Sequence, residues 1–284
     1  MEKKNLYCVI MAGGAGSRFW PYSRDSKPKQ FLDILSTGRT LLQMTFDRFR
    51  KIFPNEQIFI VTSANYKDLT LEQLPEINEE QVLLEPMRRN TAPCIAYANY
   101  RIQKLNPEAV IVVSPADHLI VHEDEFIQTL NQAIDFAATK DVLVTLGIKP
   151  GSPQTGYGYI QINPKEIDPE NMPNLRMVKT FTEKPDLEMA KVFYESGEFY
   201  WNSGIFIWSL KAIMNSFRQN LPEVNSLFSD KMDVFNTKLE QQSVEKIYAD
   251  CKNISIDYGI MEKAENVYVF CSDFGWSDLG TWGS

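Results

Sequence analysis

Short apolar runs and amphipathic stretches alternate along the first half of the chain. Five apolar runs have the length of buried strands, at residues 6–11, 58–61, 81–84, 109–113 and 143–147. Between them, apolar residues recur at steps of three and four, as at Ile95, Ala98 and Ile102, which predicts helices. Strands that alternate with helices are typical of a sheet covered by helices. The pattern predicts an α/β fold with a Rossmann-like, mixed and mostly parallel sheet.

From about residue 150 the pattern becomes less regular, because proline and glycine crowd between short apolar runs. These runs predict strands at residues 159–162, 177–181, 201–208 and 267–271. Asp186 and Gly197 have the positions of an N-cap and a C-cap, Asp124 is expected to open an earlier helix, and residues 225–255 form a mostly polar helical region. We expect one domain over residues 1–284, with a regular half at about 1–150 and a smaller irregular lobe at 151–284.

Charge and composition exclude several classes of protein. The 284 residues have a net charge of −8 and a pI near 5.0, which argues against non-specific nucleic-acid binding. Four widely spaced cysteines contain no CxxC pair, so we expect buried free thiols rather than metal ligands. No apolar run approaches the ~20 residues of a membrane span, and no signal-peptide pattern is found. We expect a cytoplasmic protein without nucleic-acid or membrane partners.

A glycine-rich run, MAGGAGSR at residues 11–18, directly follows the first predicted strand. Bare backbone N–H groups in such a turn can approach an anion, and Arg18, Lys27 and Lys29 follow as cations. The run lacks the Gly-Lys-Ser/Thr ending of an ATPase phosphate loop, and its spacing does not fit a dinucleotide fingerprint. A tight turn with incidental surface charge is the alternative interpretation.

Four unusual segments, at residues 11–18, 85–93, 114–118 and 272–278, follow predicted strands. Open α/β sheets bind ligands at the carboxyl ends of their strands. Asp117 and Asp278 are therefore the candidate ligands of one Mg²⁺, since carboxylates hold magnesium on nucleotides. Alternatively, Asp117 caps a following helix and Asp278 is an ordinary turn residue before Gly280. A phosphate nucleophile needs no general base near pH 7, so His118 and His122 are interpreted as structural.

Two further charged positions each have two interpretations. Glu85 ends a predicted strand, and a carboxylate can accept hydrogen bonds from both N1–H and the 2-amino group of guanine. Its alternative role is to pair with Arg88 or Arg89. The neighbours Glu183 and Lys184 are either a solvated ion pair at a turn or a site where the lysine holds an anionic substrate.

Seven motifs follow one another along nearly the whole chain. They are MAGGAGSRFWP at residues 11–21 with KPKQF at 27–31, EP at 85–86 with RNTAP at 89–93, PADH at 115–118, GYGYI at 156–160, FTEKP at 181–185, WNSGIF at 201–206 and WSDLGTW at 276–282. In this order they strongly resemble the sugar-nucleotide pyrophosphorylase family and, more narrowly, its mannose-1-phosphate guanylyltransferase branch. The resemblance implies the nucleotidyltransferase fold, with a nucleotide-binding first half and a sugar-binding second half.

The resemblance also implies a reaction in which GTP and mannose 1-phosphate give GDP-mannose and pyrophosphate, with Mg²⁺ as the cofactor. It implies Asp117 and Asp278 as metal ligands and Arg18, Lys29 and Lys184 as catalytic residues, of which Lys184 holds the mannose phosphate. The implied nucleotide-binding residues are Ala12, Gly13, Gly14, Gly16, Ser17, Glu85, Asn90, Thr91 and Ala116. The implied sugar-binding residues are Gly158, Glu183 and Asn202.

One departure from the family concerns the C-terminal side. The family continues past the last motif into a segment that helps dimerisation, whereas this sequence ends at Ser284, so we expect that segment to be absent and a homodimer to be weakened. Three alternatives stay open: a guanylyltransferase for another hexose 1-phosphate, a glycosyltransferase, and an inactive regulatory homologue. A glycosyltransferase would need a carboxylate pair around one residue, but Pro115 and Ala116 precede Asp117. An inactive homologue would lack the arginine, the lysine or an aspartate named above, and all are present.

Overall fold

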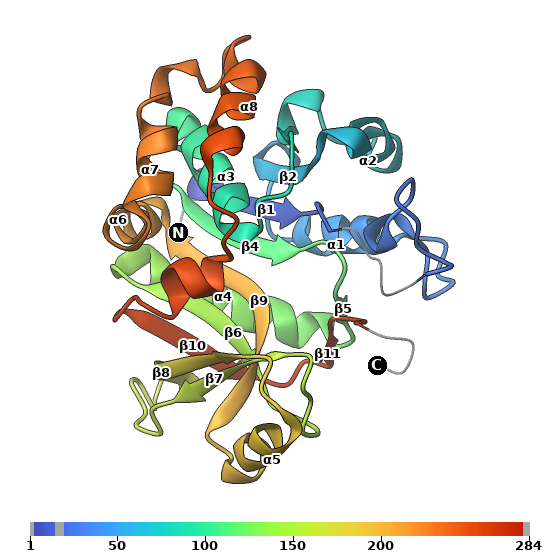
Figure 1. Ribbon diagram of the computed structural model, residues 1–284. Helices are drawn as coiled ribbons and strands as arrows, with labels where there is room; N and C mark the ends of the chain where they lie inside the picture. Colours follow the sequence, from blue (N-terminus) through green and yellow to red (C-terminus); the bar gives the residue numbers. More distant parts are fainter. Residues whose placement is uncertain (1–2, 15–19, 281–284) are drawn as a thin grey trace.

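The computed structural model describes residues 3–14 and 20–280, and this part of the chain contains a nine-stranded sheet with helices on both faces (Figure 1). The strand order is β3-β2-β1-β4-β9-β6-β10-β8-β7, and β5 pairs with β11 in a separate ribbon. The strands are β1 (Leu6–Met11), β2 (Ile58–Ser63), β3 (Val82–Glu85), β4 (Val110–Pro115), β5 (Leu119–Ile120), β6 (Leu143–Ile148), β7 (Gly158–Ile162), β8 (Leu175–Glu183), β9 (Phe199–Ser209), β10 (Val267–Ser272) and β11 (Trp276–Ser277).

Strand direction divides the sheet into two parts. Strands β3, β2, β1 and β4 are parallel to one another, and β6 is parallel to β10. Strand β9 runs antiparallel between β4 and β6, and β7 and β8 add antiparallel pairs at the other edge. The predicted α/β class is confirmed, and the sheet is mixed as expected. More of its strand pairs are antiparallel than the apolar pattern predicts, because β9, from the second half of the chain, lies in the centre of the sheet.

Successive side chains of a central strand point to opposite faces of the sheet and are apolar on both, which explains why helices cover both faces. Leu6, Cys8 and Ile10 pack into one core, and Tyr7 and Val9 pack into the other. The first core lies against α1 and α4, and the second lies against α3, α6, α7 and α8 (Figure 1). The helices are α1 (Leu41–Phe49), α2 (Lys67–Gln73), α3 (Thr91–Leu105), α4 (Glu123–Thr139), α5 (Leu187–Ser196), α6 (Leu210–Asn220), α7 (Pro222–Ser229) and α8 (Glu240–Asp250).

The caps of two helices test the sequence-based boundaries. Asp186 accepts a hydrogen bond from the backbone N–H of Met189 at 2.8 Å, and Gly197 ends α5 with a φ of 71°, as predicted. The prediction for α4 was wrong by one position, because the helix begins at Glu123. Its N-cap is His122, which makes no side-chain capping bond, and Asp124 lies inside the first turn.

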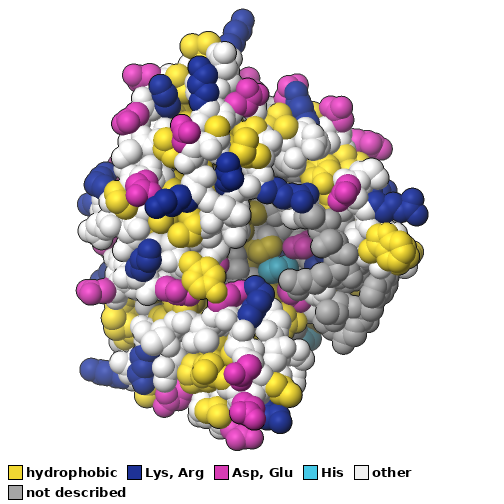
Figure 2. Space-filling model, viewed as in Figure 1, with side chains coloured by type: hydrophobic (Ala, Val, Ile, Leu, Met, Phe, Trp, Pro, Cys, Tyr) yellow, Lys and Arg dark blue, Asp and Glu magenta, His cyan; other side chains and the backbone are white. Residues whose placement is uncertain are grey.

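The surface charges, the helices and the cysteines bear on three further expectations from the sequence. Acidic and basic side chains are interspersed over the face drawn in Figure 2, which is hollowed near its middle. Among the described residues, no helix has the length and apolar character needed to cross a membrane. The four cysteines are free, and three of them are buried, whereas Cys271 is partly exposed.

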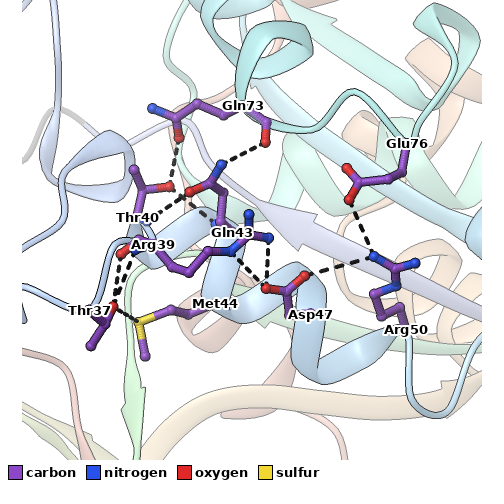
Figure 3. Close-up of polar contacts among 9 residues, drawn as sticks. All are labelled: Thr37, Arg39, Thr40, Gln43, Met44, Asp47, Arg50, Gln73 and Glu76. Atoms are coloured by element: carbon purple, nitrogen blue, oxygen red, sulfur yellow. Dashed lines mark hydrogen bonds and ion pairs between the residues drawn. The ribbon is translucent and has the colours of Figure 1, made fainter.

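The start of α1 is built from polar contacts that also hold the preceding segment (Figure 3). Thr40 Oγ1 accepts a hydrogen bond from the backbone of Gln43, and the Gln43 side chain accepts one from the backbone of Thr40. The side chain of Gln73, at the end of α2, accepts from Thr40 Oγ1 at 2.7 Å and donates to the carbonyl oxygen of Phe31 at 3.1 Å. These contacts fix the short helical turn Lys29–Phe31, which carries two residues of the candidate site.

Candidate active site

The glycine loop follows the carboxyl end of β1 and is supported by a side chain from the Lys29–Phe31 turn. Gln30 Nε2 donates to the carbonyl oxygens of Ala12 at 2.7 Å and Gly14 at 3.0 Å. A Cβ atom at Gly13 would lie 2.9 Å from Glu85 Oε2, so any side chain there would displace that carboxylate. The described start of the loop, residues 12–14, is therefore held in place by Gln30, and the absence of a side chain at Gly13 allows Glu85 to approach closely.

Of the two cations that we expected at the triphosphate, the structure describes only Lys29. Arg18 lies outside the described residues, as do Gly16 and Ser17, two of the expected nucleotide-binding residues. Lys29 is only 5% exposed, and its Nζ lies 3.0 Å from Asp117 Oδ2. The same ammonium donates to the backbone carbonyl of Asp278. Lys29 therefore joins the segment after β4 to the segment after β11.

Asp117 and Asp278, the candidate metal ligands, are thus brought to one place. Asp278 Oδ1 accepts a hydrogen bond from the backbone N–H of Gly280 at 2.7 Å. Burial and the nearby Asp278 carboxylate raise the pKa of Tyr157 to about 12. Asp117 caps no helix, because β5 follows it, whereas Asp278 does shape the turn before Gly280.

His118 lies beside Asp117, and its ring is fixed by an aromatic neighbour. Trp276 Nε1 donates to His118 Nδ1 at 3.2 Å, and the two rings are nearly perpendicular, with centroids 5.2 Å apart. Burial lowers the pKa of His118, which favours the neutral imidazole. Because Nδ1 accepts the hydrogen bond from Trp276, the neutral ring carries its proton on Nε2, which lies 3.8 Å from Asp117 Oδ1. His122 is exposed at the start of α4, and the structural role of both histidines stays a prediction.

A cavity of about 330 Å³ lies beside the glycine loop, a volume suited to a small organic ligand. Its lining includes eight of the residues expected to contact the nucleotide or its metal: Ala12, Gly13, Gly14, Glu85, Asn90, Thr91, Ala116 and Asp117. These residues come from the carboxyl ends of β1, β3 and β4 and from the start of α3. The fold thus brings together residues that lie about a hundred positions apart in the sequence.

Glu85 is the buried carboxylate of this cavity. It is 8% exposed, and its Oε1 accepts a hydrogen bond from the Tyr248 hydroxyl at 3.0 Å. Burial raises the pKa of Glu85 to about 7, although the bond from Tyr248 acts in the opposite direction. Arg88 instead donates to Tyr66, and Arg89 donates to backbone carbonyls of α8. The alternative in which an arginine pairs with Glu85 is not found among the described residues.

The loop between β3 and α3 is tied to a distant segment. Asn90 has a φ of 67° and caps α3 through a hydrogen bond from the backbone N–H of Thr91. Thr91 Oγ1 accepts a hydrogen bond from the backbone N–H of Ile256 at 2.8 Å. The backbone N–H of Ile254 donates a hydrogen bond to the carbonyl oxygen of Arg89 in the same loop. Asn90 and Thr91, both expected to bind the nucleotide, therefore have structural roles as well.

The residues expected at the sugar form a second group, at β7, β8 and β9. Gly158 pairs directly with Glu183, and a Cβ atom at Gly158 would lie 2.6 Å from Glu183 Oε2. Lys184 forms an ion pair with Glu183 and is more than half exposed, which agrees with the solvated-pair interpretation. Asn202 Oδ1 accepts a hydrogen bond from the backbone N–H of Gly204 at 3.1 Å. The role of Lys184 toward an anion stays a prediction.

Tyr157 connects the two groups of residues. Its hydroxyl lies close enough to the Asp278 carboxylate for that charge to raise its pKa. In the sequence, Tyr157 directly precedes Gly158, one of the residues expected to bind the sugar. Its ring packs between Trp201 and Trp276, with centroid distances of 4.8 and 5.2 Å. The two groups therefore lie next to each other in the fold.

The donor chemistry of Asp117 and Asp278 decides which kind of metal site they can form. The described residues contain no group of three or more His, Cys, Asp or Glu side chains able to hold a metal by themselves. Magnesium on a nucleotide is normally held by one or two carboxylates together with phosphate oxygens and waters. Asp117 and Asp278 supply such hard oxygen donors, and the Lys29 ammonium already contacts the Asp117 carboxylate and the backbone carbonyl of Asp278. The residues fit a nucleotide-bound Mg²⁺ rather than a metal site made of protein ligands alone.

The family model described as nucleotidyl transferase matches residues 7–284. The chain belongs to the nucleotidyl transferase family. Enzymes of this family generally use a divalent metal ion.

Individual relatives agree with this membership. Mannose-1-phosphate guanylyltransferase of Escherichia coli K12 is 36% identical over 289 residues, which cover the whole of this chain and 60% of the relative. A solved structure of mannose-1-phosphate geranyltransferase from Thermus thermophilus has a TM-score of 0.86 and 31% identity, covering 98% of this chain and 77% of that one. A structure of mannose-6-phosphate isomerase from Helicobacter pylori has a TM-score of 0.77 and 27% identity, covering 96% and 99%. The chain spans about 60% of the length of the curated relatives it matches.

Some residues of the candidate site lie in segments without a motif and were not predicted from the sequence. Tyr248, the partner of Glu85, lies in α8, where the pattern shows only a mostly polar helix. Asp257 contacts Asn202 from a π-helical turn, Asp257–Met261, and also escaped notice. A fully buried tyrosine hydroxyl requires a partner, but the sequence alone does not show that Tyr248 is buried.

Proposed function

We propose that this chain is a nucleotidyltransferase that makes GDP-mannose and pyrophosphate from GTP and α-D-mannose 1-phosphate. The proposal is supported chiefly by one observation: Asp117 and Asp278, from distant parts of the chain, meet at Lys29 beside the cavity that Glu85 lines. The names of the curated relatives support the same substrate pair.

In the proposed reaction, an oxygen of the sugar phosphate attacks the α-phosphorus of GTP in line, and pyrophosphate leaves. The attacking phosphate is already ionised near neutral pH, so a catalytic base is unnecessary. The protein's contribution is positioning and the neutralisation of charge. Lys29 and Arg18 would bind the triphosphate, and Lys184 would leave its pair with Glu183 to bind the sugar phosphate.

Asp117 and Asp278 would hold Mg²⁺ on the nucleotide. When bound, the ion would neutralise charge on the phosphate oxygens. The backbone N–H of Gly280 holds the Asp278 carboxylate by its hydrogen bond, and Lys29 keeps the two acidic segments together. In the second group, Gly158, Glu183 and Asn202 would surround the hexose.

An assay of the purified chain tests the proposal. GTP, ATP, UTP and dTTP are each combined with a panel of hexose 1-phosphates, and both pyrophosphate and free nucleoside diphosphate are measured. We expect pyrophosphate release that is fastest with GTP and mannose 1-phosphate. Release of free GDP would indicate a glycosyltransferase, faster turnover of another hexose 1-phosphate would change the substrate, and inactivity with every pair would indicate a regulatory homologue.

We further propose that Glu85 reads the guanine base. An ionised carboxylate accepts both N1–H and the 2-amino group, whereas adenine presents an acceptor at N1 and would give the buried carboxylate neither of these two donors. Glu85→Gln is expected to narrow the ratio of GTP to ATP use by tenfold or more, about 1.4 kcal/mol per decade. The measurement is kcat/KM for both nucleotides.

The pH dependence gives an independent readout of this role. Since burial raises the pKa of Glu85 to about 7, the carboxylate becomes protonated as pH falls through that value. The oxygen that carries the proton then no longer accepts a hydrogen bond from the base, so only one of the two guanine donors finds an acceptor. In the unmodified chain, kcat/KM for GTP should therefore fall below pH 7, and Glu85→Gln should remove this dependence. Glu80→Gln is the matched control, because Glu80 is exposed just before β3. A Glu85→Gln variant with the original nucleotide preference would exclude Glu85 as the base reader.

A further inference from the structure

Asp257 is a carboxylate that contacts Asn202, one of the residues expected to bind the sugar, and none of the sequence motifs contains it. It begins the π-helical turn Asp257–Met261, between α8 and β10, and its Oδ1 accepts a hydrogen bond from Asn202 Nδ2 at 2.7 Å. As a residue Asp257 is partly exposed, as are Gly158, Glu183 and Asn202. A π-helical turn is rare and is frequently found at functional sites.

The contacts of Asn202 fix which way its amide faces. Asn202 Oδ1 accepts hydrogen bonds from the backbone N–H of Gly204 at 3.1 Å and from Thr145 Oγ1 at 3.3 Å, while Nδ2 donates to Asp257. An inverted amide would place its oxygen against the Asp257 carboxylate and its NH₂ group against the Gly204 N–H. The amide therefore keeps one orientation and can only donate to a ligand through its remaining N–H.

The Asp257 carboxylate has the complementary capacity. Its acceptor positions number about four. One is taken by Asn202, and the residue's own backbone N–H also lies within hydrogen-bonding reach. Asn202 as a donor and Asp257 as an acceptor thus lie side by side, and a sugar hydroxyl both accepts and donates hydrogen bonds.

The electrostatic surroundings agree with this position. Burial raises the pKa of Asp257 to about 6, the hydrogen bond from Asn202 lowers it, and the charges of Glu183 and Lys184 act on it in opposite directions. Asp257 therefore lies within electrostatic reach of Glu183, which is expected to contact the sugar, and of Lys184, which is expected to hold its phosphate. At neutral pH it is largely ionised and able to accept.

We propose that Asp257 is a specificity-determining residue of the sugar site, whose carboxylate accepts a hydrogen bond from one ring hydroxyl of the hexose 1-phosphate. This assignment rests on the proposed function, and it adds a contact that selects the sugar rather than the nucleotide. Asn202 donates to the same or the neighbouring hydroxyl.

Asp257→Asn separates this role from a structural one. The new amide oxygen still accepts the hydrogen bond from Asn202, so the local structure is kept, but the NH₂ group replaces the free acceptor with a donor. Glu262→Gln is the matched control, because Glu262 is an exposed acid directly after the same turn. Thermal unfolding checks that both variants are folded. If Asp257→Asn does not fold, Asp257→Glu, which keeps the charge and moves it by one methylene, takes its place.

The experiment measures kcat/KM for α-D-mannose 1-phosphate and for its 2-, 3-, 4- and 6-deoxy analogues, with GTP held constant. In the unmodified chain, removal of the hydroxyl that Asp257 reads should lower kcat/KM by tenfold or more. In Asp257→Asn, the penalty at that one position should disappear, the penalties at the other positions should remain, and KM for GTP should change by less than threefold. Glu262→Gln should show the original set of penalties.

Two results would overturn the assignment, and they are distinguishable. If the unmodified chain is active but all four deoxy penalties are the same in Asp257→Asn, the role of Asp257 is wrong and the proposed function stands. If the unmodified chain turns over no hexose 1-phosphate with any nucleotide, the proposed function fails and the assignment fails with it.

Discussion

Lys29→Ala is expected to lower kcat by about 10²- to 10³-fold, the scale found when one preorganised electrostatic group is removed. Lys29 is almost fully buried and lies between Asp117 and the backbone of Asp278, so its ammonium is fixed before the nucleotide binds. Charge that develops on the departing pyrophosphate needs such a cation in the transition state. The measurement is kcat and KM for GTP from pyrophosphate release. Arg18→Ala should have an effect of the same order, although Arg18 lies outside the described residues.

The control for this substitution is two residues away. Lys27 is exposed, so Lys27→Ala should leave kcat within about twofold of the original value, since isolated surface charges contribute little. A change confined to KM in Lys29→Ala would mean uniform binding of substrate and transition state rather than catalysis. Unchanged turnover in a folded Lys29→Ala variant would refute the catalytic role. Folding is checked by thermal unfolding, because the change removes a buried cation beside Asp117.

Asp117→Asn and Asp278→Asn are expected to lower kcat/KM by about 10³-fold each, since charge stabilisation by a bound metal ion contributes several kcal/mol. Both changes keep the size of the side chain and remove its charge, and both aspartates should act on one ion because they meet at Lys29. The rate of pyrophosphate release is measured against Mg²⁺ concentration. Affinity for Mn²⁺ in the presence of GTP, measured by electron paramagnetic resonance, gives a readout that does not depend on turnover.

Asp273→Asn is the matched control for Asp278, because Asp273 is an exposed acid in the same segment. It should keep both the original rate and the original Mg²⁺ dependence. If Asp278→Asn shows the same Mn²⁺ affinity as the unmodified chain, Asp278 is not a metal ligand. In a crystal with nucleotide and metal, carboxylate oxygens beyond ~4 Å from the ion would contradict the assignment, given Mg–O distances of about 2.1 Å.

Local pattern was enough to place most helices and strands. The apolar runs at residues 6–11 and 143–147 fall within β1 and β6, because a strand buried on both faces must be apolar throughout. Asp186 and Gly197 marked the ends of α5 correctly, since capping depends on neighbouring backbone groups. The opening of α4 was misplaced because its N-cap, His122, makes no capping bond that a residue preference could reveal.

The candidate site was partly predictable for a different reason. Segments that follow parallel strands meet at one edge of a sheet whatever their separation in sequence, so the glycine loop, Glu85 and Asp117 could be grouped in advance. The structure brings them to one cavity. The sugar-site residues were assigned only through the resemblance of motifs, and the structure adds that Glu183 already pairs with Lys184.

By itself, the sequence determined the α/β class, most element positions and the family, because these follow from periodicity, capping residues and ordered motifs. Only the tertiary structure decided that β9 enters between β4 and β6, and that Tyr248 contacts Glu85. It also decided that Asp257 contacts Asn202. The physical reason is that a hydrogen bond between buried groups depends on which elements pack together. That choice is made by the whole core, and it leaves no periodic signal around either partner.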